Sequence, residues 1–204
     1  MTNVPAVPGL YGLVICGGIS RRMGKDKSLL DYHGKPQCYH MYEMLSFFCE
    51  KVFISCNEQQ ADGIEQGYET LTDLDYYCNS GPVAGLLTAL TSFPHHNFLM
   101  IGCDYPFLHK NDLVDFLPLC NREDPAAFYN EEAGIYEPML AYYHCNSKKQ
   151  LLEMFEAHQY SLQHFLKEMN ATKFYPKNKK SIISIDTSHD FFEAARSINL
   201  INQR

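Results

Sequence analysis

The chain lacks several features that would each assign it to a class of protein. No stretch approaches the roughly 18 consecutive apolar residues of a membrane-spanning helix, so no such helix is expected. The N-terminal residues MTNVPAVPGLYG contain no basic region followed by a long apolar core, which argues against a signal peptide. The eight cysteines include no C-x-x-C pair, so neither a zinc knuckle nor a thioredoxin-type redox pair is indicated. We therefore expect a reduced, cytoplasmic protein.

Positive charge is also scarce. The 17 lysines and arginines are outnumbered by 24 aspartates and glutamates, and the net charge of −7 argues against broad binding of nucleic acid. The apolar fraction of 46% is that of an ordinary globular protein. At 204 residues the chain is long enough for one well-packed core, and we find no repeat, low-complexity run or linker. These properties predict a single domain that covers residues 1–204.

Short apolar runs alternate with amphipathic stretches along the chain. The apolar runs predict strands at residues 11–16, 51–56, 97–102, 126–129, 137–143 and 181–185. The amphipathic stretches predict helices at residues 37–49, 58–66, 81–92 and 111–117. Ser147 with Gln150, and Thr187 with Asp190, match the capping-box pattern of helix starts. This alternation predicts an α/β fold, a three-layer sandwich with a mainly parallel central sheet and helices on both faces.

The scarce positive charge is concentrated in one loop, within the stretch VICGGISRRMGKDKSLL at residues 14–30. It contains the adjacent glycines Gly17 and Gly18, and its cations are Arg21, Arg22, Lys25 and Lys27. Adjacent glycines leave backbone N–H groups free to cradle oxyanions, and the cations supply the countercharge for phosphates. In open α/β sheets, ligands bind at such loops beyond the carboxyl ends of the strands. The spacing matches neither a Walker A loop nor the dinucleotide fingerprint, so it predicts a phosphate-binding loop of another design.

Several stretches of the chain together resemble the motifs of a known enzyme family. ICGGISRRMGKDKSLL is similar to the G-G-x-S-x-R-M-G-x-D-K signature of nucleotidyltransferases, and among them it looks most like the MobA-like molybdenum cofactor guanylyltransferases. Further matches follow in the family's order: Asp73 after a short strand, GPVAGLLTAL at 81–90 and CDYPFLHKNDL at 103–113. Weaker matches lie at 136–143 and 184–191. The resemblance covers almost the whole chain and implies the Rossmann-like nucleotidyltransferase fold.

The resemblance also implies a reaction. Enzymes of this family transfer GMP from GTP to the molybdopterin (molybdenum) cofactor and release pyrophosphate, with Mg²⁺ as their metal. Because the acceptor phosphate is already an anion, the reaction needs cations, backbone donors and a divalent metal rather than a general base. GTP and molybdopterin are then the substrates, and molybdoenzyme apoproteins or other cofactor-biosynthesis proteins are candidate partners. No nucleic-acid or membrane partner is expected.

Three residues are the predicted catalytic groups: Arg22, Lys27 and Asp104. Asp104 follows the apolar run NFLMIGC at the carboxyl end of a strand, where a carboxylate can hold Mg²⁺ together with waters and phosphates. The alternative is a turn-forming aspartate ahead of Pro106. By resemblance Lys27 matches the signature lysine, and with Arg22 it would contact the triphosphate. Asp104 is therefore the predicted metal ligand.

The predicted nucleotide-binding residues are concentrated at the ends of strands. Ile15, Cys16 and the glycines that follow would offer backbone groups, as the matching family positions do. Asp73 can accept from N1–H and the amino group of guanine, an edge that adenine does not present, and the alternative is an exposed turn aspartate. The family often has asparagine where this chain has Ser55, and Asn57 lies two residues later, so either residue can serve. The full predicted set is Ile15, Cys16, Gly17, Gly18, Lys27, Ser55, Asn57, Asp73 and Asp104.

Two further groups lie in the family's motifs. Gly81, Pro82 and Gly85 begin a helix whose N-terminus either favours an anion or packs closely on the sheet. Glu137 and Pro138 are expected on the acceptor side.

Other functions compete with guanylyl transfer. Cytidylyl or another nucleotidyl transfer, to the same cofactor or to a sugar phosphate, keeps the reaction and changes a substrate. A non-enzymatic carrier of nucleotide or cofactor is the second alternative, and it has no need of a carboxylate poised for a metal. Because Asp73 and Ser55 carry most of the argument for guanine, product analysis with each nucleoside triphosphate separates these functions.

Overall fold

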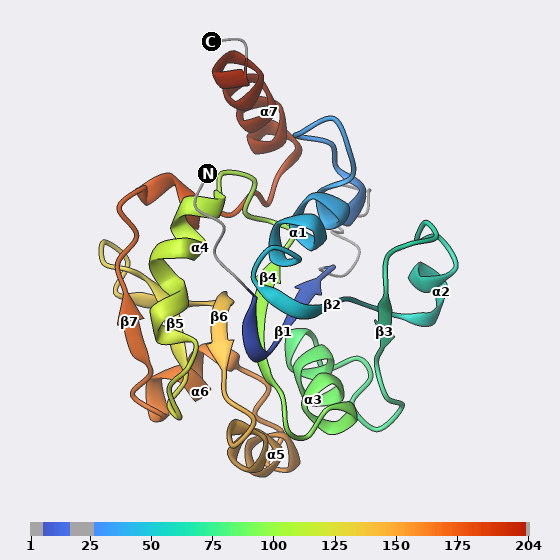
Figure 1. Cartoon of the computed structure of the whole chain (residues 1–204), viewed down its shortest axis with the longest axis vertical. Helices are drawn as coiled ribbons and strands as arrows, with labels where there is room; N and C mark the ends of the chain where they lie inside the picture. Colours follow the sequence, from blue (N-terminus) through green and yellow to red (C-terminus); the bar gives the residue numbers. More distant parts are fainter. Residues whose placement is uncertain (1–5, 17–26, 203–204) are drawn as a thin grey trace.

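The computed structural model of the chain describes residues 6–16 and 27–202, and these form a seven-stranded sheet in the order β3-β2-β1-β4-β6-β5-β7 (Figure 1). The strands are β1 (Val7–Ile15), β2 (Cys49–Cys56), β3 (Thr70–Thr72), β4 (Asn97–Gly102), β5 (Ala126–Asn130), β6 (Ile135–Tyr143) and β7 (Thr172–Phe174). The α-helices are α1 (Gln37–Leu45), α2 (Glu58–Ala61), α3 (Pro82–Ser92), α4 (Lys110–Phe116), α5 (Ser147–Glu156), α6 (Leu162–Glu168) and α7 (Ser188–Asn202). None of the helices in the described ranges combines the length and the apolar character that crossing a membrane requires.

The sheet is mainly parallel, as predicted. β1 pairs parallel with β2 and β4, β2 with β3, and β5 with β7, whereas β6 runs antiparallel to both β4 and β5. Side chains of β1 alternate between two cores because successive residues of a strand point to opposite faces. Leu10 and Val14 pack in the core that includes α1 and α4, whereas Leu13 and Ile15 pack in the core that includes α3, α5 and α6. The three-layer prediction is therefore confirmed.

The central elements agree with the predictions, although two of the helices end earlier than predicted. β4 spans Asn97–Gly102 as predicted, and α3 ends at Ser92 as predicted. The first predicted helix begins at Gln37 but ends at Leu45 instead of residue 49, because the chain turns there and Phe48 N donates to Leu45 O at 2.8 Å. α2 is likewise shorter than predicted and ends at Ala61.

The strand predicted at residues 181–185 is wrong. The segment Lys179–Ile182 forms a 3₁₀-helix instead, and Asn178 caps it by accepting from Lys180 N at 3.2 Å. Ser181 Oγ donates to Asn178 O at 2.6 Å, which closes the same turn. The edge of the sheet beside β5 is occupied by β7, a short strand that no pattern in the sequence predicted.

The two predicted capping boxes differ in outcome. Ser147 does not cap α5, because the helix begins at Ser147 itself and Asn146 is its N-cap. At the start of α7, Thr187 Oγ1 accepts from Asp190 N at 3.2 Å and donates to Asp190 Oδ2 at 2.6 Å. The side-chain contact predicted for α7 is therefore present, and that predicted for α5 is not.

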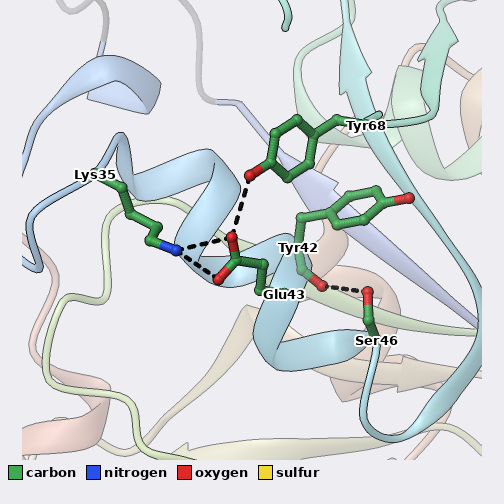
Figure 2. A network of polar contacts seen from close by, with 5 residues as sticks. All are labelled: Lys35, Tyr42, Glu43, Ser46 and Tyr68. Atoms are coloured by element: carbon green, nitrogen blue, oxygen red, sulfur yellow. Dashed lines mark hydrogen bonds and ion pairs between the residues drawn. The ribbon is translucent and has the colours of Figure 1, made fainter. Parts of the chain in front are cut away.

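A polar network fixes α1 to the segments on either side of it (Figure 2). Lys35 Nζ donates to both carboxylate oxygens of Glu43, at 2.8 and 2.7 Å, and Tyr68 OH donates to Glu43 Oε1 at 3.1 Å. Ser46 Oγ donates to Tyr42 O at 2.9 Å where the helix ends. The helix is thus attached both to the chain that enters it and to the chain ahead of β3.

The C-terminal helix α7 projects at one end of the molecule (Figure 1). Its buried residues Ala194 and Ile198 cluster with Leu30 and Tyr32, which follow the basic loop, and with Ile185 just ahead of the helix. The end of the chain therefore packs against the segment through which the chain leaves the basic loop.

Candidate active site

The carboxyl ends of the parallel strands β1, β2 and β3 border a cavity of about 590 Å³. In the sheet, Ile15 at the end of β1 pairs with both Ser55 and Gly102, so these strand ends lie at one edge. The volume is in the range of small-molecule sites. Of the predicted nucleotide-binding residues, the described ones that line this cavity are Ile15, Cys16, Ser55, Asn57 and Asp73.

The floor of the cavity is formed by residues at the ends of β1 and β2. Cys16 N donates to Ser55 O at 3.3 Å, which continues the pairing of the two strands by one residue. Ser55 is buried beneath α3, where a Cβ atom on Gly85 would collide with Ser55 Oγ. Glycine at position 85 therefore lets α3 pack closely on the sheet, which is one of the two explanations expected for this residue.

Asp73 places a half-buried carboxylate in the cavity wall, just beyond β3. Asp73 N donates to Cys56 O at 3.4 Å, and Leu74 N donates to Thr88 Oγ1 on α3 at 3.0 Å, so the turn is held from both sides. Among the described residues no donor reaches Asp73 Oδ1, although this atom is shielded from solvent. Burial raises the pKa of Asp73. A buried acceptor without a protein donor is suited to a ligand that brings N–H groups of its own.

The structure distinguishes Ser55 from Asn57, which sequence analysis could not. Asn57 is the N-cap of α2: its side chain accepts from Gln60 N at 2.9 Å, and its backbone N donates to Gln60 Oε1 at 3.2 Å. Its side-chain oxygen is thus engaged in a capping box. Ser55 lies deeper in the cavity, beneath Gly85.

The N-terminus of α3 also borders the cavity. Gly81 is its N-cap with φ at 70°, a left-handed conformation that favours glycine, and Pro82 occupies the first turn. Both residues line the cavity. The N-terminus of this 11-residue helix, where the helix dipole favours negative charge, therefore lies beside the space where a ligand would bind.

Asp104 lies at the same edge of the sheet, two residues beyond β4. It is not among the described residues that line the first cavity, so the cavity and Asp104 occupy neighbouring positions along the edge. Asp104 O accepts from Ile185 N at 2.8 Å. A Cβ atom on Gly102 would collide with Asp104 Oδ1, so the carboxylate lies over the glycine that ends the strand.

Sequence analysis missed Asp186. The hydrogen bond between Ile185 and Asp104 brings Asp186, the next residue, into the neighbourhood of the predicted metal ligand. Burial is the main cause that raises the pKa of Tyr105, and the negative charges of Asp104 and Asp186 add to it. The motif SIDTSHDF contained the signal, but only tertiary structure singles out this carboxylate.

A second cavity, of about 490 Å³, lies over the other half of the same sheet edge. It is bordered by the ends of β5 and β7 and the start of β6, and Glu137 and Tyr129 are among its lining residues. Ile183 and Ser184, just ahead of the residue that binds Asp104 O, also line it. Asp104, just beyond the end of β4, therefore lies between the two cavities along the sheet edge, and Glu137 lines the second of them.

The predicted phosphate-binding residues Gly17, Gly18 and Arg22 lie outside the residues that the structure describes, as do Arg21 and Lys25. The described chain ends at Cys16 between β2 and β4, and resumes with the 3₁₀-helix Lys27–Leu29. Lys27 is thus described only as the first residue of that helix. The roles assigned to these residues stay predictions.

Carboxylate oxygens are among the atoms at this edge of the sheet that could bind a metal ion. In the described part of the chain, no group of three or more His, Cys, Asp or Glu side chains could hold a metal ion. Asp104 and Asp186 offer two carboxylates from neighbouring segments. Mg²⁺ is commonly bound by one or two carboxylates, with waters and substrate phosphates completing its shell. This pair therefore fits Mg²⁺.

Comparison with known proteins agrees with this geometry. The model of the MobA-like NTP transferase domain matches residues 12–173. A molybdenum cofactor biosynthesis bifunctional protein of Synechocystis sp. is 39% identical over 66% of this chain, and the match spans 39% of that protein's length. A molybdenum cofactor guanylyltransferase of Pseudomonas entomophila is 31% identical over 67% of this chain and 71% of its own length.

Solved structures share the fold. Molybdopterin-guanine dinucleotide biosynthesis protein A from Archaeoglobus fulgidus matches 93% of this chain and 99% of its own, with a TM-score of 0.76 and 23% identity. A CMP:2-keto-3-deoxy-manno-octonic acid synthetase complexed with CTP matches 98% of this chain and 99% of its own, with a TM-score of 0.67 and 14% identity. The Rossmann-like nucleotidyltransferase fold is therefore confirmed.

Proposed function

Because the chain belongs to the family of MobA-like NTP transferase domains, we propose that it transfers GMP from GTP to molybdopterin and releases pyrophosphate. The observation that carries this proposal is the arrangement along the sheet edge: a cavity whose wall contains the hydrogen-bond acceptor Asp73, then Asp104, then a second cavity. The transfer of a group between two substrates needs both of them to be held side by side, and here one cavity lies on either side of a single carboxylate. The guanylyltransferase relative from Pseudomonas entomophila supports the choice of substrates.

The first cavity binds the nucleoside. Asp73 Oδ1 is a shielded acceptor with no donor among the described residues, and guanine presents N1–H and an amino group side by side. A carboxylate can accept from both groups at once. The backbone of Ile15 and Cys16 borders the same cavity, and Ser55 lies beneath it. These contacts favour guanine over adenine, whose corresponding ring nitrogen is an acceptor.

The triphosphate is directed toward the basic loop. Gly17, Gly18, Arg22 and Lys27 match the family signature and would supply backbone donors and positive charge to its oxygens. The described chain enters this loop at Cys16, which lines the cavity and follows β1, the neighbour of β4 in the sheet. The positive charge stabilises the negative charge that develops on the leaving pyrophosphate.

Asp104 and Asp186 would hold Mg²⁺ together with the phosphates. The metal supplies a positive charge that offsets the negative oxygens of both substrates and of the leaving group. In the reaction an oxygen of the acceptor phosphate forms a bond to the α-phosphorus of GTP, and the bond from that phosphorus to the bridging β-phosphate oxygen breaks. The pyrophosphate carries the electron pair away, and since the acceptor is an anion no side chain has to remove a proton.

Pyrophosphate release tests this function. The assay compares GTP, CTP and ATP with molybdopterin and Mg²⁺, in the wild type and in Asp104→Asn. We expect release with GTP, lower release with CTP and ATP, and a fall of about 100-fold or more in the variant. Preference for CTP would move the protein to cytidylyl transfer. GTP binding without release of pyrophosphate in the presence of any acceptor would identify a carrier.

A further inference from the structure

The second cavity resembles the first in one chemical respect. Each contains one half-buried carboxylate in its wall, Asp73 in the first and Glu137 in the second. Burial raises the pKa of both groups. Shielding a carboxylate from water destabilises its charged form, and a ligand that donates N–H groups to it restores the lost interactions. The pair of carboxylates therefore suggests two ligands with a similar donor edge.

Glu137 is held in a defined position. Tyr105 OH donates to Glu137 Oε2 at 2.9 Å, and Tyr105 itself is buried directly beside Asp104. Asn130, at the end of β5, also hydrogen-bonds the Glu137 carboxylate. Burial and, more weakly, the charge of Asp104 raise the pKa of Glu137, whereas these two hydrogen bonds oppose that shift. An ionised carboxylate has about four acceptor positions, so capacity for a ligand remains.

The rest of the cavity wall has the chemistry of a site for a flat, charged ring compound. Tyr129 and the half-exposed Tyr175 contact each other at a ring-centroid distance of 5.7 Å, and both line the cavity. Lys179 and Lys180 lie on the same wall, and Lys179 Nζ pairs with Glu132 at 2.8 Å. Aromatic faces accept a planar ring and the lysines accept anionic groups.

We propose that Glu137 recognises the donor edge of the acceptor's pterin ring, accepting hydrogen bonds from its N3–H and its 2-amino group. A pterin carries a 2-amino-4-oxo pyrimidine ring, so its N3–H and amino group repeat the edge that guanine presents to Asp73. This inference rests on the proposed function, which makes molybdopterin the acceptor. Tyr105 is then a positioning residue, because it orients Glu137 and adjoins Asp104.

The test compares two fluorescent probes, pterin and its 2-oxo analogue lumazine, by equilibrium titration. Lumazine has carbonyl oxygens on both sides of N3–H and would place one against the carboxylate. Hydrogen bonds to a charged group contribute strongly to binding affinity. We therefore expect pterin to bind the wild type roughly 10- to 100-fold more tightly than lumazine. Glu137→Gln still accepts from Tyr105, but it replaces one acceptor with a donor, so this preference should disappear.

Two further variants separate recognition from structural support. Glu131→Gln changes an exposed carboxylate of the same cavity and should keep the preference for pterin. Tyr105→Phe keeps the carboxylate but removes its positioning bond, and should weaken the preference without abolishing it. Equal preference in the wild type and Glu137→Gln would overturn the inference. An equal loss in Glu131→Gln, or no saturable binding of pterin to the wild type, would overturn it too.

Titration of the same proteins with GTP keeps the two proposals apart. Glu137 lies in the second cavity, so GTP affinity should be the same in the wild type and in Glu137→Gln. If the wild type binds GTP and releases pyrophosphate but Glu137 has no effect on pterin preference, the inference fails and the proposed function stands. If the wild type does not bind GTP, the proposed function fails independently of the pterin result.

Discussion

Replacing Gly102 with alanine tests whether the position of the Asp104 carboxylate limits the reaction. A Cβ atom at residue 102 would come closer to Asp104 Oδ1 than 3.0 Å, a separation that real Cβ atoms essentially never show. It would also lie 3.2 Å from Met139 Cβ and from Met139 Cε, so the new methyl group would be crowded by both side chains. The aspartate side chain must therefore move away from the strand end.

The magnitude follows from that displacement. Moving a reacting or metal-holding group by about 1 Å can lower the rate by about 100-fold. We expect kcat to fall by about this factor, because Asp104 would no longer hold Mg²⁺ in its place. The nucleoside cavity does not include Asp104 among its described lining residues, so GTP affinity measured without Mg²⁺ should change by less than about threefold. Overpacking should also lower the free energy of unfolding, by about 1–3 kcal/mol.

Gly12→Ala is the matched control. Gly12 lies in β1, and a Cβ atom there would approach Leu45 Cδ1 at 3.0 Å and Val52 Cγ2 at 3.1 Å, away from the strand ends. Both variants should be destabilised in urea unfolding, but only Gly102→Ala should lose kcat in a pyrophosphate-release assay. If both folded variants have the same kcat, the collision with Asp104 has no catalytic consequence and the reasoning is wrong.

Three further predictions concern single side chains. Asp73→Asn should weaken GTP binding, measured by calorimetry, by roughly 10- to 100-fold at neutral pH. The GTP affinity of the wild type should fall as pH drops through the raised pKa of Asp73, whereas the affinity of the variant should not depend on pH in this way. Phe128→Ala should lower the free energy of unfolding in urea by about 3–5 kcal/mol, since Phe128 is fully buried against Phe116 and Phe174. The hydrogen bond from Lys35 lowers the pKa of Glu43. The stabilisation from this pair is therefore present above the pKa of Glu43 in the unfolded chain, and it is lost as pH falls through the lower pKa of the folded protein. Glu43→Gln should reduce that acid-induced loss of stability, by at most about 1 kcal/mol because the pair is half-exposed.

The fold was predictable where local pattern and tertiary environment agree. β4 is a continuous apolar run that is buried on both faces, and its predicted and observed ends coincide. The segment around Ile182 and Ile183 has strand-like composition, but β7 already pairs with β5 at that edge and Asn178 caps a 3₁₀-helix there. β-Branched residues alone do not specify a strand, because pairing depends on which edge is available.

The candidate site was predictable to the extent that it consists of strand ends. Ile15, Ser55 and Asp73 each end or follow a parallel strand, and the parallel topology brings them to one cavity. Asp186 and the contact of Tyr105 with Glu137 could not be predicted in the same way. Each depends on segments far apart in the sequence, joined by a single hydrogen bond or by burial.

The most direct test of the central claim follows the phosphorus atoms of GTP. Wild-type protein with Mg²⁺ and molybdopterin is given GTP labelled at the α-phosphate in one reaction and at the γ-phosphate in another. Transfer of GMP predicts that the α-label appears in a molybdopterin–guanine dinucleotide and the γ-label in pyrophosphate. Label from the γ-phosphate on the acceptor, or α-label that stays in GTP, would contradict the account.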